Sequence, residues 1–150
     1  MKVLVQRSYN AKCLVDNKVV GESSKGLVIF VGFTEGDNIE KIKYLVNKII
    51  NLRIFEDENK VMNKSILEIE GTSILSISQF TLYADCKKGN RPSFTTAMAF
   101  DKANDMYLKF CDSLKESGVR VEMGVFGADM KIDFVNDGPV TIILDSDSLK

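Results

Sequence analysis

Apolar and polar residues alternate along much of the chain, in a pattern that predicts strands more often than helices. Residues 2–8 alternate with a period of two, and residues 11–15 and 18–20 form the arms of a predicted hairpin. Its turn is Asp16-Asn17, because both residue types tolerate left-handed dihedrals. Residues 26–33 are a continuous apolar run, typical of a central strand buried on both faces. Further strands are predicted at residues 73–83, 119–126, 131–135 and 139–144, while residues 61–65 form either a short strand or an irregular crossing.

Two other stretches repeat apolar residues at helical spacing. The first helix is predicted to begin at an Asp37 N-cap, to bury a stripe from Ile39 to Ile49, and to end near Leu52 or Arg53. The second has Asp101 as its cap, Gly118 at the C′ position, and a buried stripe made of Ala103, Met106, Tyr107, Phe110, Cys111 and Leu114. Because strands and helices do not alternate regularly, we expect an α+β fold. The expected form is two β-sheets in a partly closed, barrel-like β-β-α sandwich, with both helices on one side.

Composition narrows the function classes. A chain of 150 residues with 45% hydrophobic residues predicts one globular domain over 1–150. No apolar run is long enough to span a membrane and the first residues lack a signal-peptide pattern, so we expect a cytoplasmic protein. Three cysteines without a CxxC pair are expected to be reduced thiols. The chain has no histidine, which removes the usual general base and most zinc sites, and no metal or cofactor is expected.

Two polar segments interrupt the predicted strands. Ser-Gln-Phe-Thr-Leu at residues 78–82 closes an apolar run, and Asn-Asp-Gly-Pro-Val-Thr at residues 136–141 divides a β-rich region. We interpret them as one site. The simpler alternatives are hydroxyls that bond to backbone groups and a Gly-Pro turn before an edge strand. A cis Gly138-Pro139 bond would instead aim carbonyl oxygens toward an ammonium group.

A basic loop lies between these segments. Lys87, Lys88 and Arg91 form either a solvated surface or a local phosphate contact, although the net charge of −1 gives no overall attraction to nucleic acid. Cys86 beside these lysines is either an exposed loop thiol or a reactive one.

The two polar segments together resemble the signature motifs of the D-aminoacyl-tRNA deacylases, first known as D-tyrosyl-tRNA deacylases. Four other segments fall in the order and spacing of that family: Gln6-Arg7, residues 52–55, residues 91–94 and residues 124–130. The resemblance therefore covers nearly the whole chain.

What the resemblance implies is a homodimer, without cofactor, that hydrolyses the ester between a D-amino acid and the 3′-terminal adenosine of tRNA. Mischarged glycyl-tRNA is a second implied substrate; no membrane or DNA partner is implied. Each active site lies at the dimer interface, where a cis Gly-Pro step from one subunit enters the pocket of the other. A monomeric variant is therefore expected to be inactive. The implied catalytic residues are Ser78, Gln79, Phe80 and Thr81, and the implied substrate-binding residues are Gly138, Pro139, Arg7, Phe126 and Met130.

The resemblance also suggests roles for these residues. Gly138 and Pro139 would hold the α-amino group and exclude L-amino acids, Arg7 would brace them, and the Phe80 N–H would stabilise the oxyanion. An aminoacyl ester is already activated and carries its own ribose 2′-OH, so we favour hydrolysis without a protein nucleophile over attack by Thr81. The alternatives are another small-ester hydrolase using Thr81, Ser78 or Cys86, a non-catalytic RNA-binding module, and a structural dimer protein.

Overall fold

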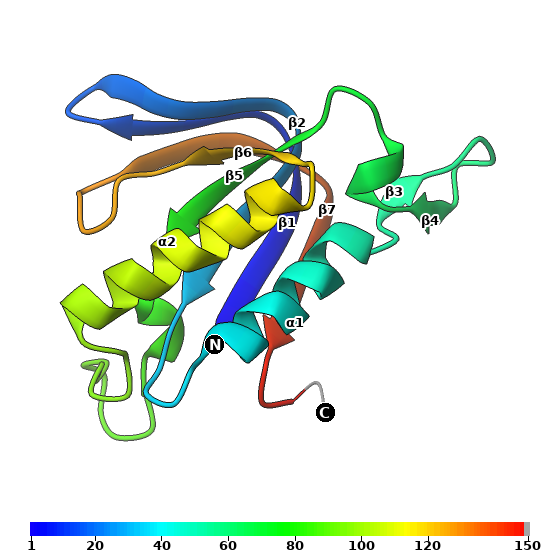
Figure 1. Ribbon diagram of the computed structural model, residues 1–150. Helices are drawn as coiled ribbons and strands as arrows, with labels where there is room; N and C mark the ends of the chain where they lie inside the picture. Colours follow the sequence, from blue (N-terminus) through cyan, green and yellow to red (C-terminus); the bar gives the residue numbers. More distant parts are fainter. Residues whose placement is uncertain (149–150) are drawn as a thin grey trace.

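A mixed five-stranded sheet in the order β6-β5-β2-β1-β7 forms the frame of the protein (Figure 1). The structure is a computed structural model that describes residues 1–148. β1 (Lys2–Val15) pairs antiparallel with β2 (Lys18–Gly32) and with β7 (Lys131–Asp145). β5 (Ser73–Ser78) runs parallel to β2, and β6 (Arg120–Met123) runs parallel to β5. β3 (Phe55–Glu56) and β4 (Met62–Lys64) make a separate small hairpin.

Both helices cover the same face of the sheet (Figure 1), as predicted. The apolar stripes of α1 (Ile39–Asn51) and α2 (Phe100–Glu116) pack against each other and against the sheet. Two short 3₁₀ turns, η1 (Ile66–Glu68) and η2 (Phe80–Tyr83), complete the regular structure. The buried helical residues are Ile42, Leu45, Val46 and Ile49 of α1 and Ala103, Tyr107, Phe110, Cys111 and Leu114 of α2. Gly118 follows α2 with a φ of 89°, as expected for its C′ position.

The opposite face of the sheet has a smaller core. Val28, Leu75 and Ile77 are fully buried there together with Cys13, while an outer row remains partly exposed: Phe30, Met130, Ile132 and Phe134. The central strand β2 is thus buried on both faces, as its apolar run predicted. The three cysteines are free thiols; burial raises the pKa of Cys13 and of Cys111, which keeps both protonated and unreactive.

Several of the predicted strands join into longer ones. The predicted segments 2–8 and 11–15 join into β1, and 18–20 and 26–33 join into β2, because ladder pairing continues through the polar residues between them. The Asp16-Asn17 turn is confirmed, with φ values of 50° and 61°. Gly26 is required inside β2, since a Cβ there would overlap the backbone of Ser73. Three closing strands were expected after α2, but 131–135 and 139–144 form the single strand β7, and the strand predicted at 119–126 ends at Met123.

The helix caps also differ from the prediction. Asn38, not Asp37, caps α1: its Oδ1 accepts the backbone N–H of Lys41 at 3.0 Å. α2 begins after Ala99 without a side-chain cap, and Asp101 lies in its first turn. Apolar spacing located both helices, but the capping residue depends on local backbone dihedrals that spacing does not contain.

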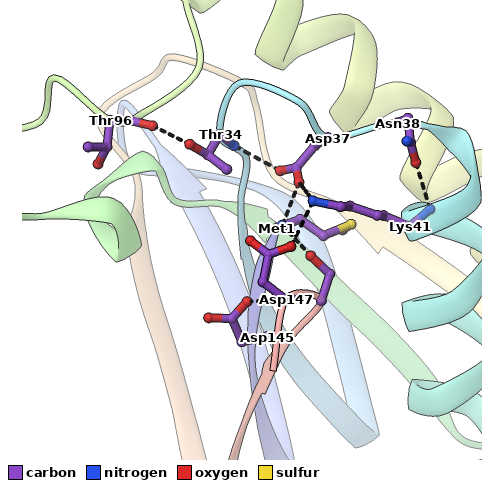
Figure 2. Close-up of polar contacts among 9 residues, drawn as sticks. Met1, Thr34, Asp37, Asn38, Lys41, Thr96, Asp145 and Asp147 are labelled. Carbon is purple, nitrogen blue, oxygen red and sulfur yellow. Dashed lines mark hydrogen bonds and ion pairs between the residues drawn. The ribbon is translucent and has the colours of Figure 1, made fainter. Parts of the chain in front are cut away.

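Asp37 instead joins three parts of the chain (Figure 2). Its Oδ1 lies 2.7 Å from the buried Met1 ammonium and 3.2 Å from Lys41 Nζ, and its Oδ2 accepts the Thr34 N–H at 2.8 Å. The ammonium also donates to Ser146 Oγ at 2.7 Å. These contacts tie the start of β1 and the chain after β7 to the entrance of α1. A buried carboxylate is tolerated here because cations and donors surround it.

Within residues 1–148, no helix is long and apolar enough to cross a membrane. A polar tail was predicted from residue 145 onward; Asp145 belongs to β7, and Leu149 and Lys150 lie outside the described residues.

The substitution Asp37→Asn tests this buried ion pair. It leaves the Met1 ammonium buried without its counter-charge, so we expect the free energy of unfolding in urea to fall by about 3–5 kcal/mol. Asp101→Asn, on the exposed first turn of α2, is the matched control, with an expected change of about 0.5 kcal/mol or less. Equal small changes in both variants would show that the pair contributes nothing.

Candidate active site

A largely apolar cavity of about 540 Å³ opens where β2 and β5 end and α2 begins. Three of the predicted catalytic residues line it: Ser78 at the last position of β5, and Gln79 and Phe80 directly after it. The predicted Phe126 and Met130 line the opposite wall. The volume is within the usual range for a small-molecule pocket.

The chain turns at this point because the pairing of β5 with β2 ends at Ser78. The Gln79 N–H donates to the Val31 carbonyl at 2.7 Å as the last contact with β2, and the chain then enters η2 rather than continuing as the strand predicted to residue 83. Within this turn, the Leu82 N–H donates to the Gln79 carbonyl at 3.4 Å. Phe80 is the first residue of η2, and its N–H has no hydrogen-bond partner among the described residues. An unpaired donor therefore lies beside the cavity.

Thr81 does not line the cavity. Its side chain is exposed and its Oγ1 accepts a hydrogen bond from Gln79 Nε2. Among the described residues, the one ionisable side chain lining the cavity is that of Asp129, which is 87% exposed and paired with Lys131 at 2.9 Å. Ser78 and Thr81 thus have no adjacent buried base, and neither hydroxyl has the surroundings of an activated nucleophile.

The wall opposite η2 is shaped by residues 124–130. Gly127 has a φ of 77°, and a Cβ there would come within 2.7 Å of the Phe100 ring. This close approach allows Phe100 to pack edge-to-face on Phe126, with ring centroids 5.0 Å apart. A Cβ on Gly124 would likewise lie 2.7 Å from Met130 Sδ. The segment is a turn, but one that forms part of the cavity.

The Gly-Pro step lies at another position on the sheet. The Gly138–Pro139 peptide bond is cis, and neither residue lines the cavity. Arg7 packs beside them: its Nη1 donates to the Ile54 carbonyl at 2.6 Å, and its Nε lies 2.8 Å from Asp137 Oδ2. A Cβ on Gly138 would lie 3.3 Å from Arg7 Nη2 and 2.8 Å from the Val140 backbone N. Arg7 is therefore in contact with the segment it was expected to brace.

The side chain of Asn136 holds this segment in shape, a role that the sequence analysis missed. Its Nδ2 donates to the Arg7 and Val140 carbonyls, both at 3.1 Å, and its Oδ1 accepts from Gln6 Nε2 at 2.9 Å and Thr141 Oγ1 at 3.0 Å. The ladder between β1 and β7 is interrupted here, passing from Gln6↔Thr141 to Ser8↔Asn136. Asn136 replaces the missing backbone pairs. The signal in the sequence was the amide side chain of Asn136 two residues before the Gly138-Pro139 step.

The two polar segments do not meet within one chain. Ser78 pairs with Val31, and Val31 pairs with Val3 of β1. Gly138 instead lies in the β7 irregularity between Asn136 and Thr141, beside Arg7. Four residues along a strand span about 13 Å, and three steps between strands add about 14 Å in the perpendicular direction. Within one chain the two segments are therefore apart, and their union in one site across a dimer interface stays a prediction.

Other cavity residues were not predicted as site residues. Phe94 packs edge-to-face on Phe80 at 5.1 Å, and Phe100 is 63% exposed at the start of α2. Phe100 precedes the apolar stripe of its helix, and this offset was a signal that it does not belong to the core. Among residues 1–148, no group of three or more Cys, Asp or Glu is placed to hold a metal ion.

These features describe an α+β protein with a ligand cavity at the end of a mixed sheet. The family model for D-Tyr-tRNA(Tyr) deacylase matches residues 4–145. A D-aminoacyl-tRNA deacylase of Clostridium botulinum (strain 657 / Type Ba4) is 53% identical over 97% of both chains, and one of Fusobacterium nucleatum is 51% identical over 97% of this chain and 96% of the other. The chain belongs to the D-Tyr-tRNA(Tyr) deacylase family.

Solved structures agree with this fold. A c-Myc DNA unwinding element binding protein superimposes with a TM-score of 0.90 at 37% identity, over 97% of this chain and 98% of the other. A probable eukaryotic D-amino acid tRNA deacylase has a TM-score of 0.82 at 22% identity, over 95% of this chain and 97% of the other, and supports the fold alone.

Asn136→Ala tests the support of the Gly-Pro segment. Removing a half-buried amide that makes four hydrogen bonds should lower the free energy of unfolding by about 1–3 kcal/mol. The control is Asn51→Ala, because the Asn51 amide bonds only to Asn47 on the exposed surface of α1, and a change of about 0.5 kcal/mol is expected. Urea unfolding of both variants measures the difference. A loss in Asn136→Ala no larger than in Asn51→Ala would contradict the assignment.

Proposed function

We propose that this protein hydrolyses the ester bond of D-aminoacyl-tRNA, and of mischarged glycyl-tRNA, to free amino acid and tRNA. The observation that carries the proposal is the cavity at the end of β5, which collects Ser78, Gln79, Phe80, Phe126 and Met130 in a chain that matches the deacylase family along nearly its whole length. The substrate is made during translation, so we place the activity in the cytoplasm.

The reaction requires little from the side chains. Water adds to the ester carbonyl, the carbonyl oxygen becomes an oxyanion, and the bond to the ribose 3′-oxygen breaks as that oxygen takes a proton. The Phe80 N–H, which has no hydrogen-bond partner among the described residues, is the proposed oxyanion donor because Phe80 lines the cavity. No base lines the cavity apart from exposed Asp129, which favours proton transfer through the substrate's own 2′-OH.

The filter for chirality is proposed to come from a second copy of the chain. Gly138 and Pro139 are exposed and lie far from the cavity of their own chain, so they can enter a cavity only across an interface. Arg7 and Asn136 hold them rigidly from behind. Backbone atoms of Gly138 and Pro139, placed against the α-carbon of the substrate, would accept hydrogen bonds from its ammonium group. They would collide with an L-side chain but leave a D-side chain or glycine free.

An interface along β7 fits the surface of the chain. β7 is an edge of the sheet, and its outward Val135 and Ile143 are 56% and 73% exposed. The partly exposed row on the second face of the sheet, which includes Phe30 and Phe134, lacks a covering helix. A second copy would cover both features, and the two sheets together would form the barrel-like arrangement that one chain leaves open.

A second candidate is a nucleic-acid-binding module, favoured by the name of the 37% identical solved structure. A net charge of −1 gives no general attraction to DNA or RNA. Another small-ester hydrolase using Thr81 or Ser78 would need a base that the cavity does not supply. Covalent labelling by an electrophilic ester would favour the esterase, and RNA binding that is blind to the aminoacyl group would favour the module.

Matched D-tyrosyl-tRNA, L-tyrosyl-tRNA and glycyl-tRNA test the activity directly. We expect release of D-tyrosine and glycine, with kcat/KM for the L-ester lower by about 100-fold or more, equal to roughly 2.7 kcal/mol of transition-state free energy. Similar rates for the D- and L-esters would leave an esterase but remove the chiral filter. Absence of release from all three would favour the binding module.

Thr81→Val separates the two possible mechanisms. Thr81 lies outside the cavity and only orients Gln79, so we expect kcat/KM for D-tyrosyl-tRNA to remain within about tenfold of wild type, whereas losing a nucleophile costs on the order of 10⁴-fold or more. Cys86→Ser, in the exposed loop, is a control expected to be unchanged. Complete loss in Thr81→Val with tRNA binding preserved would make Thr81 the nucleophile.

A further inference from the structure

Three cations beside the cavity have no acidic partner. They belong to the segment 86–92, here called the cationic loop, which carries Lys87, Lys88 and Arg91. All three side chains are exposed, and within residues 1–148 none of them forms an ion pair. Exposed cations clustered this closely repel one another, so an unpaired group of three favours an anionic ligand.

The base of the cationic loop is fixed at the rim of the cavity. Asp85 N–H donates to the Ser93 carbonyl at 2.8 Å, and Ser93 N–H returns to the Asp85 carbonyl at 2.9 Å. The loop thus starts just after η2 and ends just before Phe94, whose ring packs on Phe80 at the cavity. Figure 1 shows this green loop beside the start of α2, at the end of the molecule away from the β3–β4 hairpin.

Two other cations near the cavity are paired with carboxylates. Lys131 is paired with Asp129 at 2.9 Å, and Lys102, in the first turn of α2, lies 3.6 Å from Glu35. At the base of the loop, Asp85 Oδ1 accepts the backbone N–H of Lys87, and within residues 1–148 it forms no ion pair with a cation. Lys2 Nζ lies 4.8 Å over the Tyr83 ring of η2. Among the described residues, the cationic loop is therefore the group of three unpaired cations at this rim.

The chemistry of the substrate then identifies the ligand. With the aminoacyl ester inside the cavity, the polynucleotide must leave across the rim, where Phe80 and Phe94 are 55% and 37% exposed. Exposed aromatic rings next to free cations are the usual surface for single-stranded nucleic acid. Lys87 and Arg91 are each two residues from the Asp85–Ser93 bridge, so their Cα atoms lie within about 7 Å of it.

We propose that Lys87, Lys88 and Arg91 bind the phosphates of the single-stranded 3′ end of tRNA, immediately before the terminal adenosine. The inference rests on the proposed function and extends it from the ester to the polynucleotide. It also accounts for RNA binding by a chain of net charge −1: attraction is confined to the exit from the cavity. Contacts of this kind are independent of sequence, because phosphates carry no base information.

The test compares two substrates and four proteins. D-tyrosyl-tRNA carries the 3′ phosphates, and D-tyrosyl-adenosine has the same ester without them. The proteins are wild type, Lys87→Ala/Lys88→Ala, the charge-preserving Lys87→Arg/Lys88→Arg, and Lys43→Ala/Lys109→Ala. The last pair removes the same charge from exposed positions on α1 and α2. Each kcat/KM is measured between about 50 and about 200 mM salt, the range over which phosphate contacts change affinity steeply.

For D-tyrosyl-tRNA, we expect the double alanine variant to raise KM at low salt. The slope of log(kcat/KM) against log salt should become less steep by about 1.4, which is about 0.7 for each lost contact with a single strand. The arginine variant and the α1/α2 control should follow wild type. All four proteins should hydrolyse D-tyrosyl-adenosine equally, because that ester has no phosphate for the loop to bind.

A salt slope unchanged by Lys87→Ala/Lys88→Ala would overturn the inference while leaving the deacylase intact. An equal loss on D-tyrosyl-adenosine would also overturn it, since the loop would then act by shaping the cavity. If wild type hydrolyses neither ester, the proposed function fails. The loop is then judged by the salt dependence of binding to deacylated tRNA, where the same difference between the variants supports the inference and its absence overturns it.

Discussion

The simultaneous pairing of β2 with β1 and β5 is the constraint on which the rest of the structure depends. β2 meets an antiparallel neighbour on one side and a parallel neighbour on the other, and its apolar residues are buried on both faces. A parallel neighbour requires a crossover, which α1 and the β3–β4 hairpin supply. The last contact of that pairing, from Gln79 N–H to the Val31 carbonyl, decides where the chain turns and hence where the cavity opens.

The two motifs of the family occupy opposite parts of this sheet and are supported in different ways. Around the cavity, aromatic and thioether side chains close on Gly124 and Gly127, positions where a Cβ would collide with them. Around the Gly-Pro segment, polar side chains replace the backbone pairs that β7 loses at its irregularity. The two motifs lie apart in one chain. This division is the physical argument for an active site shared between two copies.

The proposed hydrolysis requires few chemical groups from the protein. A cavity without a buried base suits a substrate that is already activated and brings its own hydroxyl. In the proposed mechanism, the protein would contribute the unpaired N–H at Phe80, exclusion of the L-enantiomer, and retention of a long polynucleotide. The cationic loop would provide that retention outside the cavity, so binding of the chain end and selection at the α-carbon would depend on separate residues.

Sequence alone determined the two helices, the Asp16-Asn17 turn and the buried central strand. It also determined the kinds of elements and the identity of both motifs. All of these depend on local periodicity and residue type. It did not determine that polar stretches such as residues 21–25 continue a strand, or that Asp37 is the partner of the Met1 ammonium rather than a cap, since both depend on residues distant in the chain. It also assigned Thr81 to the site together with its neighbours, whereas a 3₁₀ turn moves that side chain out of the cavity. The separation of Ser78 from Gly138 was decided by strand order and register. Both depend on which strands pair with one another, and no local sequence pattern contains that information.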